Sequence, residues 1–259
     1  MRYKTLSLLI LCCVLLAGLF ILDNYVLSGG QDQDTERKRQ EPEAVSLNLV
    51  VGQAGSIKKD VGAPIFADKD LKAEKTGSIQ YNCCVIKEDP ENGVNESEWI
   101  PVEAGDNTQS AVGYVQPDDI KEYDLVISDQ SRIRMEIVKN ALHYLGLRFK
   151  RYGGSLKNGI DCSNFVQQIY KLSGISIPSK CNDIIKSGDP VALKRARPGD
   201  IVYYPVNNGY GHVGIYLNDG FIISSSGHSG KTYPEGGVRI SYVIYRDREE
   251  YTVYDLIDS

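Results

Sequence analysis

The sequence predicts an α+β domain over its second half, with helices packed on an antiparallel sheet, preceded by a small all-β module and a single N-terminal transmembrane helix. Within residues 131–256, helical segments come first and short strands follow, which is typical of an α+β arrangement. Short alternating segments separated by Gly, Pro, Asn and Asp fill residues 45–122, as in a small barrel or sandwich. An uncharged apolar run covers residues 6–22. These three observations define the expected organisation of the chain.

The first 28 residues have the pattern of a membrane anchor. Arg2 and Lys4 precede the apolar run. A signal peptide needs small residues at its cleavage site, and the nearest pair, Ala17 and Gly18, is followed by further apolar residues. We therefore expect an uncleaved single-pass helix that contacts the cytoplasmic membrane through residues 6–27, with secretion after signal cleavage as the alternative. The basic residues ahead of the span predict that the rest of the chain lies outside the cytoplasm.

Composition narrows the possible partners. Residues 29–44 are almost purely polar with charges of both signs, which predicts a solvated linker. The formal net charge of −5 argues against nucleic-acid binding and against electrostatic attachment to a membrane surface.

In the module at 45–122, Trp99 is expected in the core. Its strands are expected at residues 47–51, 63–66, 78–86, 99–102 and 112–115.

Cysteine and histidine spacing predicts neither a zinc site nor a disulfide framework. Cys83 and Cys84 are adjacent, and two buried strand residues are a better interpretation than a strained vicinal disulfide. The histidines are scattered and no C-x-x-C occurs, so we expect no metal and no cofactor. The three histidines are His143, His212 and His228.

One cysteine occupies an unusual position. After a predicted helix near residues 131–146, Asp161 is a good N-cap and Gly174 a good stop for a second helix, so Cys162 falls in its first turn. Unpaired backbone N–H groups at a helix start favour the thiolate over the thiol. A small buried residue is the simpler interpretation of a cysteine taken alone, and a reactive thiol needs a second group nearby.

His212 is the candidate for that second group. A cysteine nucleophile needs a base near neutral pH, and histidine is the side chain best matched to that task. His212 begins a predicted strand over 213–217 directly after a glycine-rich loop at 207–211, so it lies at a strand end that a helix N-terminus can face. Residues 218–220 then predict a tight hairpin turn into a strand at 221–226.

An ordered set of motifs resembles the NlpC-type cell-wall peptidases, which have a papain-like fold. The motifs occur in the family's order over about residues 131–256 and are together far more specific than any one alone. They are Tyr152-Gly153-Gly154, Asp161-Cys162-Ser163-Asn164-Phe165, Pro198-Gly199-Asp200-Ile201-Val202 and His212-Val213-Gly214-Ile215-Tyr216-Leu217.

The resemblance implies a peptidase domain at residues 128–259 that cleaves peptidoglycan stem peptides, most often between D-glutamate and the following diamino acid. Residues 45–122 resemble a bacterial SH3-like domain in the pairing of a tryptophan strand at 99–102 with a glycine-aromatic strand at 113–115. Such modules often precede this peptidase and commonly bind wall material or border its cleft.

Carried onto this sequence, the resemblance makes Cys162 the nucleophile and His212 the general base. Tyr152 matches the family's tyrosine near the nucleophile. Asp161 and Ser163 match positions that hold the free amine of the stem peptide. Cys181 falls where the family often has a substrate-contacting serine.

The third catalytic position departs from the family, which usually has His, Asn, Gln or an acid there. The count along the resemblance places Ser224 in this slot, where it would orient His212. Strand register tests the count, because a two-residue turn at Asp219-Gly220 would put Ser224 on the wrong face, whereas a three-residue turn would put it on the face of His212. Otherwise Ser225 takes the slot, or His228 folds back to help.

Three functions remain open. The first is an extracytoplasmic cysteine peptidase acting on stem peptides. The second, motivated by Ser224, is a catalytically weak or inactive wall-binding protein that retains the fold. The third is amidase or acyl-transfer chemistry on another wall or lipid substrate, which the Asp161-Cys162-Ser163 context disfavours.

Overall fold

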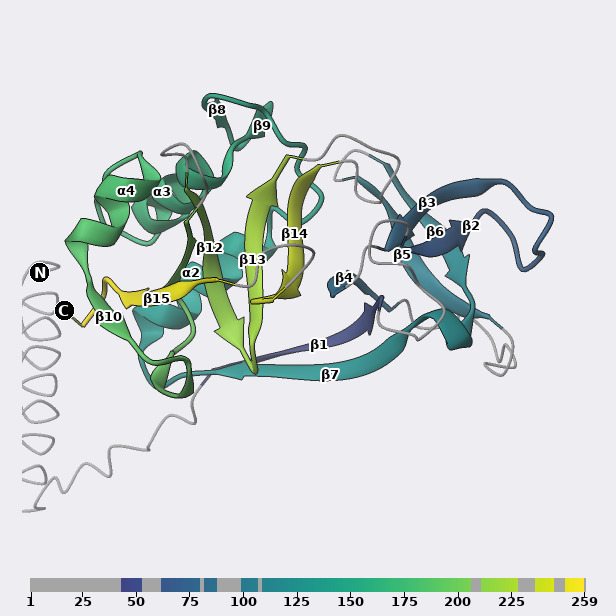
Figure 1. Ribbon diagram of the computed structural model, residues 1–259, viewed down its shortest axis with the longest axis horizontal. Helices are drawn as coiled ribbons and strands as arrows, with labels where there is room; N and C mark the ends of the chain where they lie inside the picture. The colour runs from purple at the N-terminus through teal and green to yellow at the C-terminus, as the bar shows by residue number, and fades with distance from the viewer. Residues whose placement is uncertain are drawn as a thin grey trace, which may run out of the picture. The chain divides into compact units, whose positions relative to one another are not determined.

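The computed structural model describes residues 43–52, 62–79, 82–87, 99–106, 109–205, 211–227, 236–244 and 250–258. The predicted anchor at 1–28, the linker at 29–42, the loop at 207–210 and His228 lie outside these ranges. Within them, no helix is long and apolar enough to cross a membrane. Element labels follow Figure 1.

Strands from both halves of the chain share one antiparallel sheet of nine strands, in the order β10-β15-β11-β12-β13-β14-β4-β1-β7 (Figure 1). The junction is made by β14, whose Ile240 and Ser241 pair with Cys84 and Cys83 of β4. The bounds are β1 Ala44–Val51, β4 Cys83–Ile86, β7 Lys121–Ser128, β10 Asp189–Val191, β11 Ile201–Tyr204, β12 His212–Asn218, β13 Phe221–Ser226, β14 Gly237–Tyr242 and β15 Thr252–Asp255.

The other early strands form a four-stranded antiparallel sheet in the order β3-β2-β6-β5. Its bounds are β2 Ala63–Phe66, β3 Lys75–Ile79, β5 Ile100–Asp106 and β6 Gln109–Val115. A short pair, β8 Gly154–Ser155 and β9 Gly159–Ile160, precedes the second helix. The strands expected at 47–51, 63–66, 99–102 and 112–115 are therefore present, but they divide between two sheets. The single strand expected at 78–86 is instead two strands, β3 and β4, which lie in different sheets. A closed SH3-like barrel is not shown by the residues described. Trp99 is buried, as expected of a core residue, and meets Phe66 edge to face.

The helices are short and few in the described chain. They comprise α2 Arg132–Leu142, α3 Cys162–Leu172 and α4 Cys181–Ile184, with single 3-10 turns η1 Pro117–Asp119, η2 Ile185–Ser187 and η3 Leu193–Arg195. The expected helix near 131–146 ends earlier than the sequence predicts, because Leu147 enters pairing with Val238 near β14. His143 is exposed at the end of α2.

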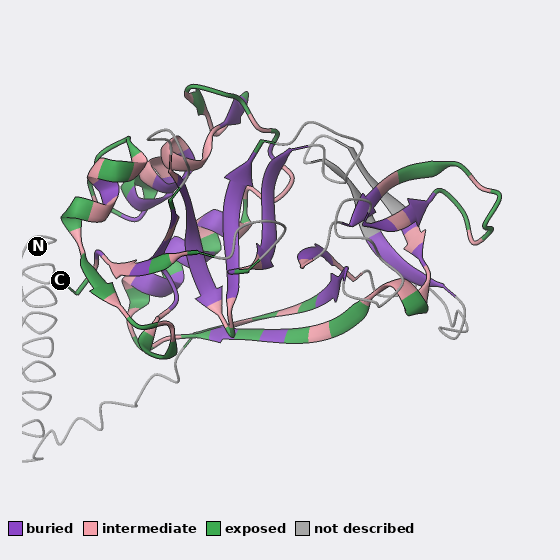
Figure 2. Ribbon diagram, in the orientation of Figure 1, coloured by how far each residue is buried: buried purple, intermediate pink, exposed green. Residues whose placement is uncertain are grey.

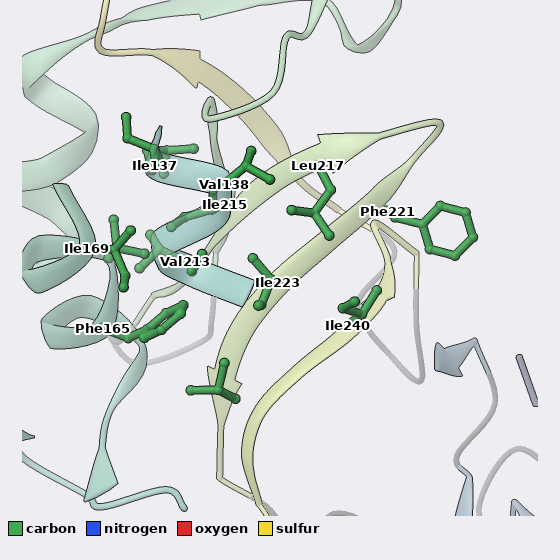
Figure 3. Packing of buried hydrophobic residues seen from close by; sticks show 14 of the residues in the cluster. Ile137, Val138, Phe165, Ile169, Val213, Ile215, Leu217, Phe221, Ile223 and Ile240 are labelled. Atoms are coloured by element: carbon green, nitrogen blue, oxygen red, sulfur yellow. The ribbon is translucent and has the colours of Figure 1, made fainter. Parts of the chain in front are cut away.

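Helices α2 and α3 pack their apolar faces on one face of the nine-stranded sheet. In Figure 3, Phe165 and Ile169 of α3 lie beside Val213, Ile215 and Ile223 of the sheet. Leu49, Leu125 and Ile127, from β1 and β7, belong to the same cluster, so the early strands complete the core under the helices. Strands β12 and β13 are buried along almost their whole length (Figure 2).

The opposite sheet face packs against the four-stranded sheet. Tyr204, Tyr216 and Ile222 form a second apolar cluster with Ile65 and Val102. Cys83 and Cys84 are both buried on β4, as the sequence predicts. Both faces of β11–β14 are thus covered.

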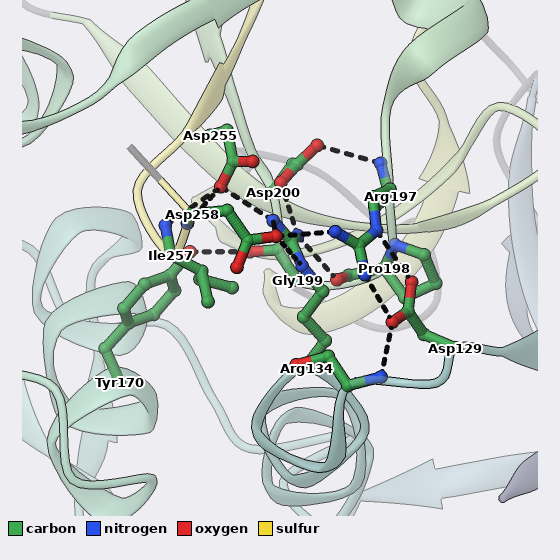
Figure 4. Close-up of polar contacts among 11 residues, drawn as sticks. Asp129, Arg134, Tyr170, Arg197, Pro198, Gly199, Asp200, Asp255, Ile257 and Asp258 are labelled. Atoms are coloured by element: carbon green, nitrogen blue, oxygen red, sulfur yellow. Dashed lines mark hydrogen bonds and ion pairs between the residues drawn. The ribbon is translucent and has the colours of Figure 1, made fainter. Parts of the chain in front are cut away.

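An ion-pair network links α2 to the segment that contains Asp255 and Asp258 (Figure 4). The Arg134 guanidinium, fully buried, donates to Asp200 at 2.6 Å, to Asp255 at 2.7 Å and to Asp258 at 3.0 Å. Arg197 joins Asp258 to Asp129, the residue just after β7. Burial alone would raise the pKa of Asp129, but hydrogen bonds from Arg197 and the Ser131 N–H outweigh it and lower that pKa. Motif residue Asp200 is therefore a structural partner of Arg134.

Candidate active site

Helix α3 positions Cys162 through its cap and its core face. Asp161 has extended backbone angles, and its Oδ1 accepts the Asn164 N–H at 2.9 Å, which starts the helix where the sequence predicts. Phe165 and Ile169 are fully buried in the core. The cap and the buried face together fix Cys162 in the first turn, where backbone N–H groups and the helix dipole favour an anion.

The Cys162 thiol lies 4.0 Å from the thiol of Cys181, the first residue of α4. The pKa of Cys162 lies well below its ordinary value because Cys181 hydrogen-bonds its sulfur and because His212 adds a charge and a hydrogen bond, which together outweigh the opposing effect of burial. The same hydrogen bond, with burial, raises the pKa of Cys181. Cys162 is therefore the more acidic thiol of the pair and Cys181 the less acidic one.

His212 stands at the start of β12, opposite Tyr204 of β11. Its ring is only 5% exposed, and its Nε2 lies 3.2 Å from Ser224 Oγ. Because Nε2 faces Ser224, Nδ1 is the ring nitrogen left for the hydrogen bond with Cys162. The structure thus brings Cys162, His212 and Ser224 together, with one ring joining the cysteine to the serine.

The strand register that brings Ser224 to His212 has a different origin from the one that the sequence predicts. The hairpin has a two-residue turn, with Asn218 paired to Phe221 and positive φ angles of 49° at Asp219 and 81° at Gly220. A bulge between Tyr216 and Asn218 then shifts the register by one residue, so that Ile215 pairs with Ile223.

With that shift, Gly214 faces Ser224, and a Cβ on Gly214 would lie 3.0 Å from the Ser224 Cβ. The predicted dependence on a three-residue turn is wrong, because the extra residue is in the strand. The alternative occupant, Ser225, faces the helices and donates to Ile160 O at 2.6 Å.

The remaining predicted residues are placed around this centre. Tyr152 is 78% exposed in a left-handed conformation, with its ring beside the Arg151 guanidinium. The Asp161 carboxylate accepts hydrogen bonds from Asn164, from Ser163 Oγ at 3.2 Å and from the Gly153 N–H, so it ties the glycine turn to the helix. Cys181 also donates to Gly211 O at 3.4 Å. The structure therefore brings Cys181 into the site and leaves Tyr152 at the surface.

Sequence reasoning missed two polar residues beside the site, Arg239 and Ser241 of β14. They alternate with Val238 and Ile240, a pattern typical of a strand with one solvent face. Both are nevertheless buried. Nothing local signals this, because the covering sheet is supplied by a distant part of the chain. No group of three or more His, Cys, Asp or Glu side chains in the described ranges is arranged to hold a metal ion.

One family model matches the part of the chain that contains Cys162, His212 and Ser224. Residues 147–243 match the NlpC/P60 family model. The NlpC/P60 match includes Cys162, Cys181, His212, Ser224 and Arg239.

Curated relatives are named as peptidases, and one of them as an enzyme of murein. Gamma-D-glutamyl-L-lysine dipeptidyl-peptidase of Bacillus subtilis is 29% identical over 70% of this chain and 61% of its own length. Murein DD-endopeptidase MepS/Murein LD-carboxypeptidase of Escherichia coli is 32% identical over 38% of this chain and 52% of its own length. The chain thus spans less than two thirds of either relative.

Solved structures of the NlpC/P60 family also align. A family protein from Bacillus cereus aligns with a TM-score of 0.42 and 20% identity, over 81% of this chain and 63% of that chain.

Proposed function

We propose that the protein is an extracytoplasmic cysteine peptidase that cleaves peptidoglycan stem peptides, at the bond between D-glutamate and the following diamino acid. The observation that carries the proposal is the Cys162 thiolate at the start of α3, hydrogen-bonded to a His212 ring whose other nitrogen faces Ser224. The names of the curated relatives support the substrate class.

In the proposed reaction, Cys162 Sγ attacks the scissile carbonyl carbon, and the Cys162 backbone N–H at the helix start stabilises the oxyanion. The carbon–nitrogen bond then breaks while His212 gives its proton to the leaving amine. Water next attacks the thioester as His212 takes a proton from it, which releases the carboxylate and restores Cys162. Ser224 holds the ring through Nε2, although a hydroxyl offers imidazolium less charge stabilisation than a carboxylate.

Substrate contacts are proposed for the residues around this centre. Asp161 and Ser163 hold the free amine of the stem peptide, since a carboxylate facing an ammonium is favourable. Tyr152 closes over the nucleophile from its exposed position, and Cys181 contacts the peptide from the other side.

The location and the N-terminal module complete the proposal. The anchor at 1–28 holds the enzyme on the outer side of the cytoplasmic membrane, where its substrate lies. Residues 45–122 are an SH3-like module that binds wall material or borders the cleft. The antiparallel pairing of Ile100 with Val115, between β5 and β6, supports this resemblance.

The test is to incubate the full chain with defined stem peptides and detect products by mass spectrometry. Wild type is expected to cleave after glutamate, and Cys162→Ala is expected to lose about 10⁴-fold or more of the rate because no other group replaces the nucleophile. Cys83→Ala, which removes a buried cysteine of β4, is the matched control. Undiminished cleavage by Cys162→Ala would refute the proposal.

A second function is favoured by one observation, the serine in the position that orients His212. In this alternative the protein binds wall peptides without turning them over. Binding of the stem peptide to wild type with no product in the digest would establish it.

A further inference from the structure

Two arginines are buried among the residues that the structure describes, and they have opposite surroundings. Arg134 is fully buried and donates to three carboxylates and to the Pro198 carbonyl (Figure 4). Arg239 on β14 is 2% exposed, yet its Nε and both Nη atoms have no hydrogen-bond partner in the part of the chain that the structure describes. A buried cation without an acceptor is strongly unfavourable, so we expect an anion that the described residues do not supply to complete the position.

A second orphaned group lies beside Arg239. Ser241 is two residues further along β14, so its side chain points to the same sheet face. Its Oγ is also buried without a partner among the described residues. A guanidinium fork and a hydroxyl that share a face provide donors suited to a carboxylate.

The strand register connects this pair to the candidate active site. Arg239 is the direct cross-strand partner of Ser224, so the two side chains share a sheet face. Ser224 Oγ in turn lies 3.2 Å from His212 Nε2. Strands β12 and β14 are two spacings apart, about 10 Å, a separation that an extended arginine covers in large part. The orphaned donors therefore neighbour the reacting centre.

We propose that Arg239, with Ser241, binds the free α-carboxylate of the D-glutamyl residue whose side-chain carboxyl forms the scissile bond. This inference rests on the proposed function. In a γ-linked glutamyl residue the α-carboxylate stays free, and only a short aliphatic linker separates it from the scissile carbonyl. Arg239 is then a specificity residue that distinguishes glutamate from its α-amide.

The experiment compares two stem peptides that differ only in a carboxylate or carboxamide at this position. Wild type is expected to prefer the carboxylate by about 10- to 100-fold in kcat/KM, mostly through KM. Arg239→Gln removes most of that preference and Arg239→Lys part of it, whereas Arg132→Gln, an exposed arginine of α2, leaves it intact. A merely structural arginine would lower both rates together, so an unchanged ratio in Arg239→Gln would overturn the proposal.

Binding measurements separate this result from failure of the proposed function. If wild type cleaves neither peptide, the affinities of wild type and Arg239→Gln for the two peptides are measured by calorimetry. The ratio of the affinities for the carboxylate and carboxamide peptides then tests the role of Arg239. Free acetate could raise the Tm of wild type but not that of Arg239→Gln, while the preference for the carboxylate peptide is the same in both proteins. In that case a free anion occupies the site and the specificity proposal is refuted.

A different observation carries a second inference, because Cys162 and Cys181 place two thiols 4.0 Å apart at the site. A disulfide needs the sulfurs at about 2.05 Å, so side-chain rotation at the two helix starts has to bring them closer together. We infer that Cys162 and Cys181 form a reversible disulfide that switches the enzyme off.

The oxidant is a small-molecule disulfide. Cys162 thiolate attacks one of its sulfurs, forming a mixed disulfide and releasing one thiolate, which takes the proton held by His212 and leaves as a thiol. Cys181 then loses its proton to His212 and attacks the Cys162 sulfur, releasing the second thiolate. The protein loses two electrons and two protons, and the small disulfide is reduced to two thiols. The low pKa of Cys162 suits it to the first attack.

Treatment of wild type with oxidised glutathione is expected to abolish labelling of Cys162 and to give a peptide in which Cys162 and Cys181 are linked, with both effects reversed by dithiothreitol. In Cys181→Ser the expected product is a stable mixed disulfide on Cys162, while Cys83→Ala behaves as wild type. A wild type that accumulates only the mixed disulfide would overturn the inference.

Discussion

Replacement of His212 by alanine is expected to lower kcat/KM for stem-peptide cleavage by about 10²- to 10⁴-fold, because the base and the later proton donor are both lost. Ser224→Ala, which removes only the hydroxyl behind the ring, is expected to lose about 10-fold or less, the effect of one neutral hydrogen bond. Comparing the losses in the two variants distinguishes the base, His212, from the residue that orients it, Ser224.

Alkylation of Cys162 gives a second readout of the His212 variant. His212 lowers the pKa of Cys162 through its charge and hydrogen bond, so removing it moves the pH midpoint of iodoacetamide labelling upward. Cys181 still lowers that pKa in the variant, which limits the shift. An unchanged midpoint would show that His212 does not face the nucleophile.

Asp200→Ala is expected to lower the free energy of unfolding by about 3 to 5 kcal/mol, because it leaves the buried Arg134 without its shortest ion pair. The matched control is Asp258→Ala, which removes another partner of the same guanidinium but one whose side chain is 48% exposed, and about 1 kcal/mol or less is expected. Urea denaturation of the three proteins measures both values. Equal losses would show that burial does not set the strength of this network.

Local signals predicted the parts of the site that depend on neighbours in sequence. The cap at Asp161, the apolar spacing of Phe165 and Ile169 and the Asp219-Gly220 turn lie within a few residues of what they determine. For this reason the helix carrying Cys162 and the strand carrying His212 have nearly the bounds expected from the pattern.

The features that sequence reasoning missed depend on partners far away in the chain. Strand β7 was not predicted, although Tyr123, Leu125 and Ile127 alternate with exposed residues in the manner of a strand. The pairing of Ile240 with Cys84 has no local signal, and it is what joins the two sets of strands in one sheet. Arg239 is buried because β14 pairs with β4. The alternation of polar and apolar residues in β14, which normally indicates a solvent-exposed face, therefore gave the wrong prediction there.

The bulge in β12 has a consequence for how this gene tolerates insertions and deletions. Strand β13 reads Phe-Ile-Ile-Ser-Ser-Ser, so a slip of one residue exchanges isoleucine for isoleucine and serine for serine at most positions. The strand therefore carries little information about its own alignment, and the Asp219-Gly220 turn with the adjacent bulge supplies it. A single-codon deletion at Leu217 would remove the bulged residue and leave Ile215 paired with Ile223, so the hydroxyl that serves His212 would keep its place.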